Sequence, residues 1–149
     1  MKYIKLLENF RERDKTRSKS QDIAHNIINL ANQLFKDPSG WKEFLVSSSA
    51  AWIQPDICQV EFRYKGSAAL YFDMRLAQGQ VLGTEYILIK VYWGPKTIDM
   101  KDIMTPFYDY LKFLFNDNVA YTVSDLDDIQ SKLSLDDYEL WKEAGKYNL

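Results

Sequence analysis

Three runs in the middle of the chain alternate between polar and apolar residues. They cover 58–65, 69–76 and 84–93. Alternation places successive side chains on opposite faces of a β-strand, so each run predicts a strand with one buried face. The residues expected on that face are Val60, Phe62, Tyr64, Leu70, Phe72, Met74, Leu76, Ile87, Ile89, Val91 and Trp93. We expect the three strands to form an antiparallel meander.

The third run is apolar on most of its second face as well, at Tyr86, Leu88 and Tyr92. A strand that is apolar on both faces usually lies inside its sheet rather than at an edge. A meander of three strands would leave this run at an edge, so a fourth strand should pair with it. The alternating segment 119–123 is the candidate.

Helical spacing of apolar residues marks the N-terminal part of the chain. A short amphipathic helix is predicted first, and the basic stretch 11–19 either continues it or forms a linker. The apolar face of this helix would consist of Tyr3, Leu6, Leu7 and Phe10. Ser18 and Gln21 have the spacing of a capping box, which predicts that a second, strongly amphipathic helix begins there.

Further helices are predicted on both sides of the alternating runs. Residues 41–48 fit a helical period better than alternation, and residues 54–56 should interrupt the chain before the first strand. The span 97–115 is also helical by its spacing, and Pro106 predicts either a kink or a helix that starts at Thr105.

The acidic tail carries two serines that precede acidic residues, Ser124 and Ser134, and each predicts a helix N-cap. Gly145 is the expected end of the last helix. Together the patterns predict an α+β fold, with an antiparallel sheet of about four strands and helices on one or both faces. We expect one globular domain over 1–149, with 1–19 as a basic N-terminal helix or arm.

Composition and charge narrow the class of protein. A single cysteine among 149 residues excludes an internal disulfide, and no apolar run has the length of a membrane span. These features, together with the lack of a signal peptide, predict a cytoplasmic protein without membrane contact. Residues 1–20 carry seven basic and three acidic side chains, whereas residues 97–149 carry five basic and eleven acidic ones. A basic start and an acidic end of the chain can guide electrostatic docking of a partner, but they also occur as ordinary solvated surface.

Catalytic and metal-binding patterns are missing from the sequence. His25 and Cys58 are the only imidazole and thiol, and they have no zinc-site spacing. His25 is expected on a wet helix face, and Cys58 is expected to point inward. Ser47, Ser48 and Ser49 lie in no nucleophile elbow, and the glycines form no phosphate-binding loop. We therefore expect a protein that is not an enzyme and uses no metal and no cofactor.

The second face of the predicted sheet combines basic and aromatic side chains. They are Arg63, Lys65, Tyr71, Arg75, Tyr86, Lys90 and Tyr92. Such a mixture is typical of a platform on which nucleic-acid bases stack, although Glu61 and Asp73 on the same face reduce its net charge. The order of one helix, three antiparallel strands and one helix over about 20–115 also resembles the double-stranded-RNA-binding domain in layout. The basic start of that family's last helix is replaced here by 99–102, Asp-Met-Lys-Asp.

Protein binding is the function that the sequence favours, and nucleic-acid binding is the alternative. Aromatic residues make up 15% of the chain, so some are expected at the surface, where Tyr and Trp dominate binding hot spots. The helix face of Tyr3, Leu7 and Phe10 docks either on its own domain or on a partner. Small size, few cysteines and a slight acidity suit an inhibitor, immunity protein, antitoxin or chaperone, including inhibitors that phages and other mobile elements carry, such as anti-CRISPR proteins. The oligomeric state stays open.

Overall fold

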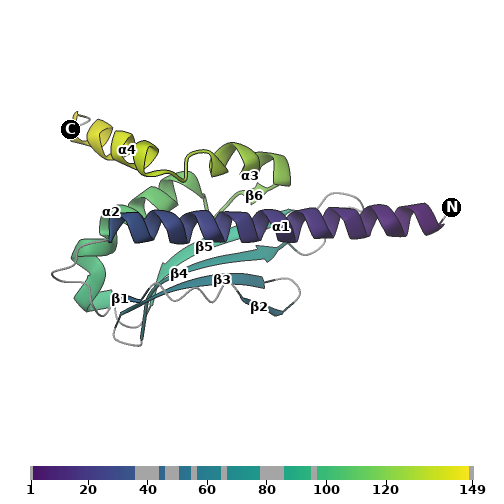
Figure 1. Cartoon of the computed structure of the whole chain (residues 1–149), viewed down its shortest axis with the longest axis horizontal. Coiled ribbons are helices and arrows are strands. Elements are labelled where there is room, and N and C mark those ends of the chain that lie inside the picture. The colour runs from purple at the N-terminus through teal and green to yellow at the C-terminus, as the bar shows by residue number, and fades with distance from the viewer. Residues whose placement is uncertain are drawn as a thin grey trace.

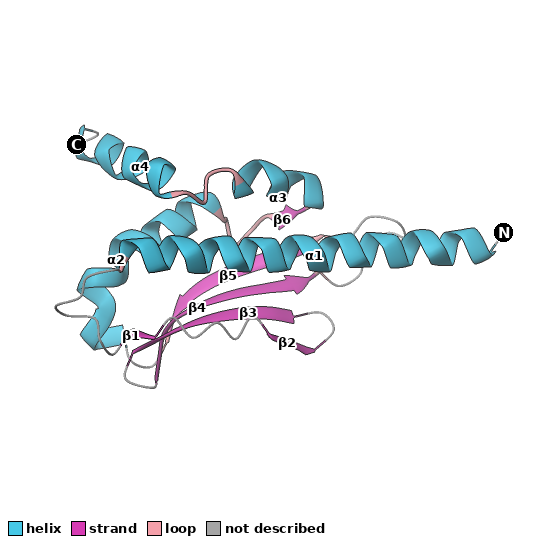
Figure 2. Cartoon of the chain, viewed as in Figure 1, coloured by secondary structure: helices cyan, strands magenta, loops and turns pink. Residues whose placement is uncertain are grey.

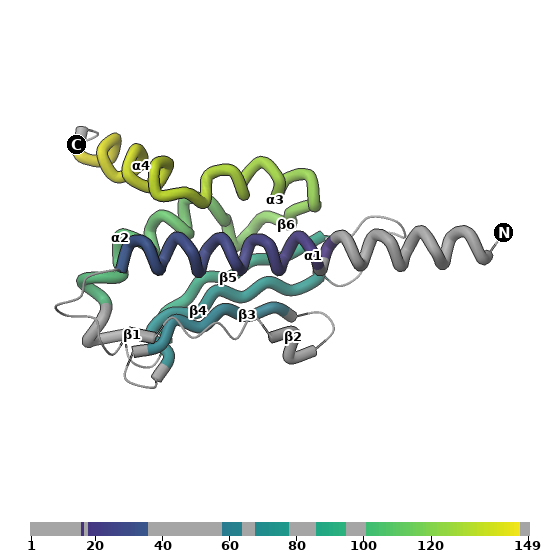
Figure 3. The backbone as a smooth tube through the Cα atoms, in the orientation of Figure 1, coloured from purple at the N-terminus to yellow at the C-terminus, as the bar shows by residue number. Residues whose placement is uncertain are grey.

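The structure is a computed structural model that describes the backbone of residues 2–35, 44–45, 51–54, 57–64, 67–77, 86–94 and 97–147 (Figure 3). Side chains are described at 16, 18–35, 58–63, 68–77, 86–94 and 101–146. The elements in chain order are α1 (Lys2–Leu34), β1 (Phe44–Leu45), β2 (Ala51–Gln54), β3 (Ile57–Tyr64), β4 (Ser67–Leu76), β5 (Ile87–Trp93), α2 (Thr97–Leu114), β6 (Ala120–Tyr121), α3 (Val123–Gln130) and α4 (Leu135–Tyr147) (Figure 1).

The four predicted strands form the body of an antiparallel sheet, so the α+β fold is confirmed. Strands β3, β4 and β5 are consecutive neighbours, and β6 pairs with the far side of β5 (Figure 2). Val60 lies opposite Phe72, and Phe72 lies opposite Val91, so the apolar positions of the three strands fall in one row. Strand β6 is shorter than the predicted 119–123 because Thr122 already caps α3.

Two short strands that the sequence did not predict pair with the outer edge of β3. Phe44 lies opposite Tyr64, and Trp52 lies opposite Cys58. The predicted helix over 41–48 is therefore wrong at 44–45, and the predicted break over 54–56 is wrong at Gln54, which ends β2. An unpaired strand edge leaves backbone N–H and C=O groups without hydrogen-bond partners. The hydrogen bonds gained by pairing with β3 outweigh the weak helical period of 41–48.

Helices α1 and α2 cover one face of the sheet, and the core lies between them and the strands. The inward side chains at Val60, Phe62, Leu70, Phe72, Met74, Ile87, Ile89 and Val91 are buried, as predicted. Phe107 of α2 meets Phe62 edge to face with ring centroids 5.4 Å apart, and Phe115 meets Phe72 at 5.2 Å. Trp93 is only half-buried and stacks on Tyr108 of α2 at 4.6 Å.

Helix α1 is continuous from Lys2 to Leu34, so the stretch 11–19 continues the first predicted helix. The capping box predicted at Ser18 is wrong, because Ser18 is an exposed residue inside this helix. Arg, Glu and Lys are good helix formers, so nothing in the stretch forces an end. The buried Ser20 hydroxyl donates to the carbonyl of Thr16, 2.9 Å away, which satisfies it within the helix. The side chains of Tyr3, Leu7 and Phe10 lie outside the described residues.

Helix α2 runs through Pro106, so it does not start at Thr105. Figure 1 shows that the helix bends along its length, as a proline without an N–H donor favours. Helix α4 packs on α2 through Tyr138 and Trp141, whose rings lie 5.2 and 5.1 Å from that of Tyr110. Among the helices of the described chain, none combines the length and the apolar character that a membrane span requires.

The two tail helices differ in how well their caps were predicted. Ser134 caps α4, since its hydroxyl accepts from the Asp137 N–H at 3.2 Å. The cap of α3 is Thr122 and not Ser124, because the Thr122 hydroxyl accepts from the Asp125 N–H at 3.1 Å and the Asp125 carboxylate accepts from the Thr122 N–H at 2.9 Å. The predicted end at Gly145 is also wrong, since α4 continues to Tyr147.

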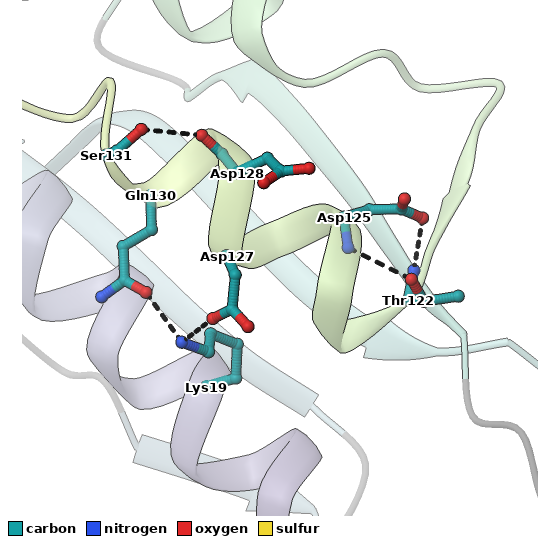
Figure 4. Close-up of polar contacts among 7 residues, drawn as sticks. All are labelled: Lys19, Thr122, Asp125, Asp127, Asp128, Gln130 and Ser131. Carbon is teal, nitrogen blue, oxygen red and sulfur yellow. Dashed lines mark hydrogen bonds and ion pairs between the residues drawn. The ribbon is translucent and has the colours of Figure 1, made fainter.

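A polar contact joins the basic and acidic ends of the chain. Lys19 of α1 donates to the Gln130 side chain of α3 at 2.9 Å and forms an ion pair with Asp127 (Figure 4). Thr122 and Asp125 form the capping box at the other end of the same helix (Figure 4). Part of the charge asymmetry in the sequence is therefore used inside the fold, where it holds α3 against α1.

Candidate functional site

The face of the sheet that points away from α1 and α2 carries the polar side chains of the strands. Its outward positions alternate with the buried ones along β3, β4 and β5. They are Gln59, Glu61, Arg63, Tyr71, Asp73, Arg75, Leu88, Lys90 and Tyr92, and all are half-buried or exposed. Helix α2 packs on the opposite, inner face, where Phe107 meets Phe62. We call these nine residues the outer face, and it is the main surface of the sheet that the core does not use.

A hydrogen-bonded network occupies the middle of the outer face. The carboxylate of Asp73 accepts from the Gln59 side-chain amide at 2.7 Å and from the Tyr92 hydroxyl at 2.7 Å. The register places Gln59 directly opposite Asp73, while Tyr92 is the diagonal neighbour of Asp73 on the next strand. One carboxylate thus connects β3, β4 and β5, and both of its oxygens have a fixed donor.

Two stacked tyrosines border this network. Tyr71 and Tyr92 lie opposite each other across β4 and β5, with ring centroids 4.9 Å apart and ring planes 20° apart. The Lys90 ammonium lies 5.4 Å from the centre of the Tyr92 ring, within the range of a cation–π contact. The two rings are therefore held in place before any ligand binds.

Gly94 provides the space for the Tyr71 ring. A methyl group added at Gly94 would lie 3.1 Å from a ring carbon of Tyr71 and 2.7 Å from the carbonyl carbon of Ala68. This close approach occurs where the pairing of β3 and β4 shifts between Phe62 and Arg63, with a bulge at Ala69. The Gly94 N–H donates to Ala69 at 2.9 Å, so β5 is fixed to the bulge.

The charges of the outer face nearly cancel. Arg63, Arg75 and Lys90 oppose Glu61 and Asp73, three basic against two acidic side chains, for a net charge of +1. Arg63 forms a two-point contact with Glu61, with nitrogen–oxygen distances of 2.7 and 2.9 Å. Arg75 and Lys90 form no ion pair with any residue in the described part of the chain. Asp73 therefore does not pair with its basic neighbour Arg75, because the amide and the phenol hold the carboxylate.

Two groups on these strands keep their protons at neutral pH. Burial, together with the hydrogen bond to Asp73, raises the pKa of Tyr92 to about 12. Burial, with a smaller effect of the Asp73 charge, raises the pKa of Cys58 to about 11. Cys58 is fully buried on the inner face, and His25 is exposed on α1, as predicted for both. A protonated, buried thiol is a poor nucleophile.

The structure brings together five of the residues proposed for the platform, namely Arg63, Tyr71, Arg75, Lys90 and Tyr92. Tyr86 is half-buried just before β5, and Lys65 lies outside the described residues. The sequence pattern did not single out Gln59, nor did it indicate that Asp73 is the centre of a network. Alternation alone identifies both as outward, but only the register reveals that they face each other.

The described surface is hollowed at the outer face and between the helices. A hollow of about 370 Å³ opens on the outer face beside Arg75, Lys90 and Tyr92. A groove of about 610 Å³ lies between the end of α1, α2 and α4, with Phe35 and Tyr138 in its wall and Lys142 at its rim. Within the described ranges, no cluster of three or more His, Cys, Asp or Glu side chains has the arrangement of a metal site.

Comparisons with models of protein families, with curated proteins and with solved structures found no match for this chain.

Proposed function

We propose that this chain is a non-catalytic protein-binding protein and that the outer face of the sheet is its binding surface. The observation that carries the proposal is the network of Gln59, Asp73 and Tyr92, with Tyr71 stacked beside it, on the face opposite to the one on which α2 packs. The core does not need these polar side chains. Their fixed positions reduce the ordering cost of binding, which is how a preorganised surface gains affinity.

The balance of charge favours a protein partner over a nucleic acid. A polyanion needs several basic side chains that are free to contact phosphates. Here Arg63 is engaged by Glu61, and the Tyr92 ring is flanked by Tyr71 and Lys90, so little of its surface is left for a base. A surface with half-buried tyrosines and a net charge of only +1 suits the centre of a protein interface. Within this class, the size and composition of the chain suit a protein that blocks or escorts one partner.

The test begins with co-purification of the tagged full-length chain from its native host and identification of bound proteins by mass spectrometry. The dissociation constant of the purified complex is then measured for Tyr71→Ala and for Phe113→Ala. Phe113 is a matched control because it is an aromatic residue with 64% exposure on α2, in the layer behind the sheet. We expect Tyr71→Ala to weaken binding about tenfold or more, as for a hot-spot residue, and Phe113→Ala to leave it unchanged. Equal affinities for the two variants would contradict the proposed surface.

Nucleic-acid binding is measured separately by fluorescence anisotropy with single- and double-stranded DNA and RNA at two salt concentrations. We expect no retention at about 150 mM salt. Micromolar binding that a folded Arg63→Glu/Arg75→Glu variant loses would replace the proposed function with the alternative.

A further inference from the structure

The hollow on the outer face lies where β4 and β5 meet the turn that follows α2. It has a volume of about 370 Å³, and its lining includes Asp73, Arg75, Leu88, Lys90, Tyr92 and Asp117. A volume of this size is near the lower end of the range for small-molecule sites, so it suits one side chain and its neighbour. The hollow is therefore large enough to receive part of a peptide.

The register brings two basic side chains to this hollow. Arg75 lies opposite Leu88, and Lys90 lies opposite Asp73, so Arg75 and Lys90 are diagonal neighbours across β4 and β5. Diagonal neighbours on one face of a sheet are about 7–8 Å apart at the backbone, within reach of one shared anion for long side chains. Both side chains are exposed, and neither forms an ion pair with the described residues.

The acidic side chains at the hollow are already engaged. Asp73 accepts from Gln59 and Tyr92, and Asp117 forms an ion pair with Lys112 at 2.5 Å. With Lys112 counted against Asp117, the hollow has Arg75 and Lys90 against Asp73, a net charge of +1. One added carboxylate would neutralise the hollow, whereas a chain of phosphates would place further negative charges beside Asp73 and Glu61.

The hollow also has an apolar part. Leu88 is half-buried on the outer face, and the side of the Tyr92 ring borders the same space. A ligand that carries a carboxylate next to an apolar group would contact both parts. Acidic side chains beside apolar ones are common on protein surfaces, so this chemistry is available to a protein partner.

We propose that this hollow receives the carboxylate of one acidic side chain of the partner protein, between Arg75 and Lys90, with a neighbouring apolar residue of the partner on Leu88 and Tyr92. This inference rests on the proposed function and adds the chemistry that the partner must present. The two basic side chains then select the partner residue, and the Gln59–Asp73–Tyr92 network holds the floor on which it lies.

The first experiment titrates blocked dipeptides into the isotope-labelled full-length protein. Binding is measured from the changes in its backbone amide chemical shifts. The probes are acetyl-Leu-Glu-amide and its uncharged counterpart acetyl-Leu-Gln-amide. We expect the Glu peptide to shift the amides of Arg75, Leu88 and Lys90 with a dissociation constant on the order of millimolar, and the Gln peptide to bind at least about fivefold more weakly. Equal binding of the two peptides, or shifts confined to another surface, would overturn the proposal.

Charge-matched variants locate the effect. Arg75→Gln/Lys90→Gln and Lys101→Gln/Lys132→Gln both remove two positive charges, but Lys101 and Lys132 are exposed residues that do not line the hollow. We expect the first pair to abolish the preference for the Glu peptide and the second pair to retain it. Loss of the preference in both variants would mean that only the overall charge matters, which contradicts a site at the hollow.

The dissociation constant of the complex with the partner tests the carboxylate site and the proposed binding surface separately. We expect Arg75→Gln/Lys90→Gln to weaken the purified complex by about tenfold or more, in parallel with Tyr71→Ala. If Tyr71→Ala weakens the complex while Arg75→Gln/Lys90→Gln leaves it unchanged, the carboxylate site is wrong and the proposed function stands. If neither variant weakens it, the proposed surface is wrong as well.

Discussion

The two faces of the sheet are built from the same three strands and follow different rules. On the inner face, Phe72 and its neighbours are buried and apolar, and any close-packed set of similar volume would serve. On the outer face, Asp73 needs Gln59 and Tyr92 in particular, because among the described residues those two side chains donate to its two oxygens. The inner face thus contains residues that hold the fold together by packing. The outer face contains residues that are fixed by specific hydrogen bonds, which packing of the core does not require.

The largest difference between the faces is expected from truncating one side chain on each. Phe72→Ala removes a fully buried ring that meets Phe115, and we expect it to lower the free energy of unfolding by about 3–5 kcal/mol. Arg75→Ala, three residues further along β4, removes an exposed side chain and should change stability by less than about 0.5 kcal/mol. Urea unfolding measures both, and equal midpoints would show that the assigned strand register is wrong.

A second comparison is between a glycine packed against the outer face, Gly94, and a glycine in the helical layer, Gly145. Gly94→Ala places a methyl group against the Ala68 carbonyl and the Tyr71 ring, and we expect a loss of about 1–3 kcal/mol because the backbone at the bulge cannot move away easily. Gly145→Ala in α4 meets nothing within 4 Å and should stabilise the protein by about 0.5–1 kcal/mol, since alanine is the better helix former. Thermal melts of the two variants should shift in opposite directions. A neutral Gly94→Ala would contradict the close packing of Tyr71 over β5.

The polar network should contribute less to stability than the core. Asp73→Ala leaves the Gln59 amide and the Tyr92 hydroxyl without their acceptor, with an expected loss of about 1–2 kcal/mol. Glu61→Ala is the matched control, because the ion pair of its carboxylate within the described chain is with the exposed Arg63, which should contribute less than about 1 kcal/mol. Urea unfolding measures both losses. A larger loss in the free energy of unfolding for Glu61→Ala than for Asp73→Ala would contradict a stabilising role of the network.

The smallest expected effect is the response of the outer face to alkali. The pKa of Tyr92 is about 12 in the folded protein and 10.0 for a free phenol, so the unfolded chain loses this proton first as the pH rises. Stability from Tyr92 is complete below a pH of about 10 and is lost as the pH rises to about 12. Burial raises the pKa of Tyr110 to about 12 as well, so Tyr92→Phe should remove only part of the alkaline loss. The alkaline loss of stability is measured for the wild type and for Tyr92→Phe as the change in the urea midpoint between a pH of about 9 and of about 11.5. An unchanged loss in Tyr92→Phe would contradict the raised pKa.

Local patterns predicted the elements that rest on strong periodicity. The alternating runs became β3, β4 and β5, and the apolar spacing of 97–115 became α2. The predictions failed where a weak local signal competed with packing. Ser18 lies inside α1 although it has the spacing of a cap. Thr122 caps α3 in place of Ser124, because β6 ends at Tyr121 and the helix begins two residues later.

The candidate site was predicted in its residues but not in its arrangement. Alternation identified Arg63, Tyr71, Arg75, Lys90 and Tyr92 as outward, and the structure agrees. It did not indicate that Tyr71 stacks on Tyr92 or that Gln59 belongs to the site. The observed surface is nearly neutral rather than basic, and on it Arg75 and Lys90 form no ion pair with the described residues.

The sequence by itself determined which side of each strand is buried, because a period of two residues assigns every side chain to one face. It also determined that the core is apolar and that Cys58 belongs to it. Only the tertiary structure decided how the strands align, and therefore which outward side chains meet. Asp73 lies between Gln59 and Lys90 because residues 14 and 17 positions away in the chain are its neighbours across two strands. Such pairings depend on register and on the bulge at Ala69, and the alternating pattern of a single strand contains neither.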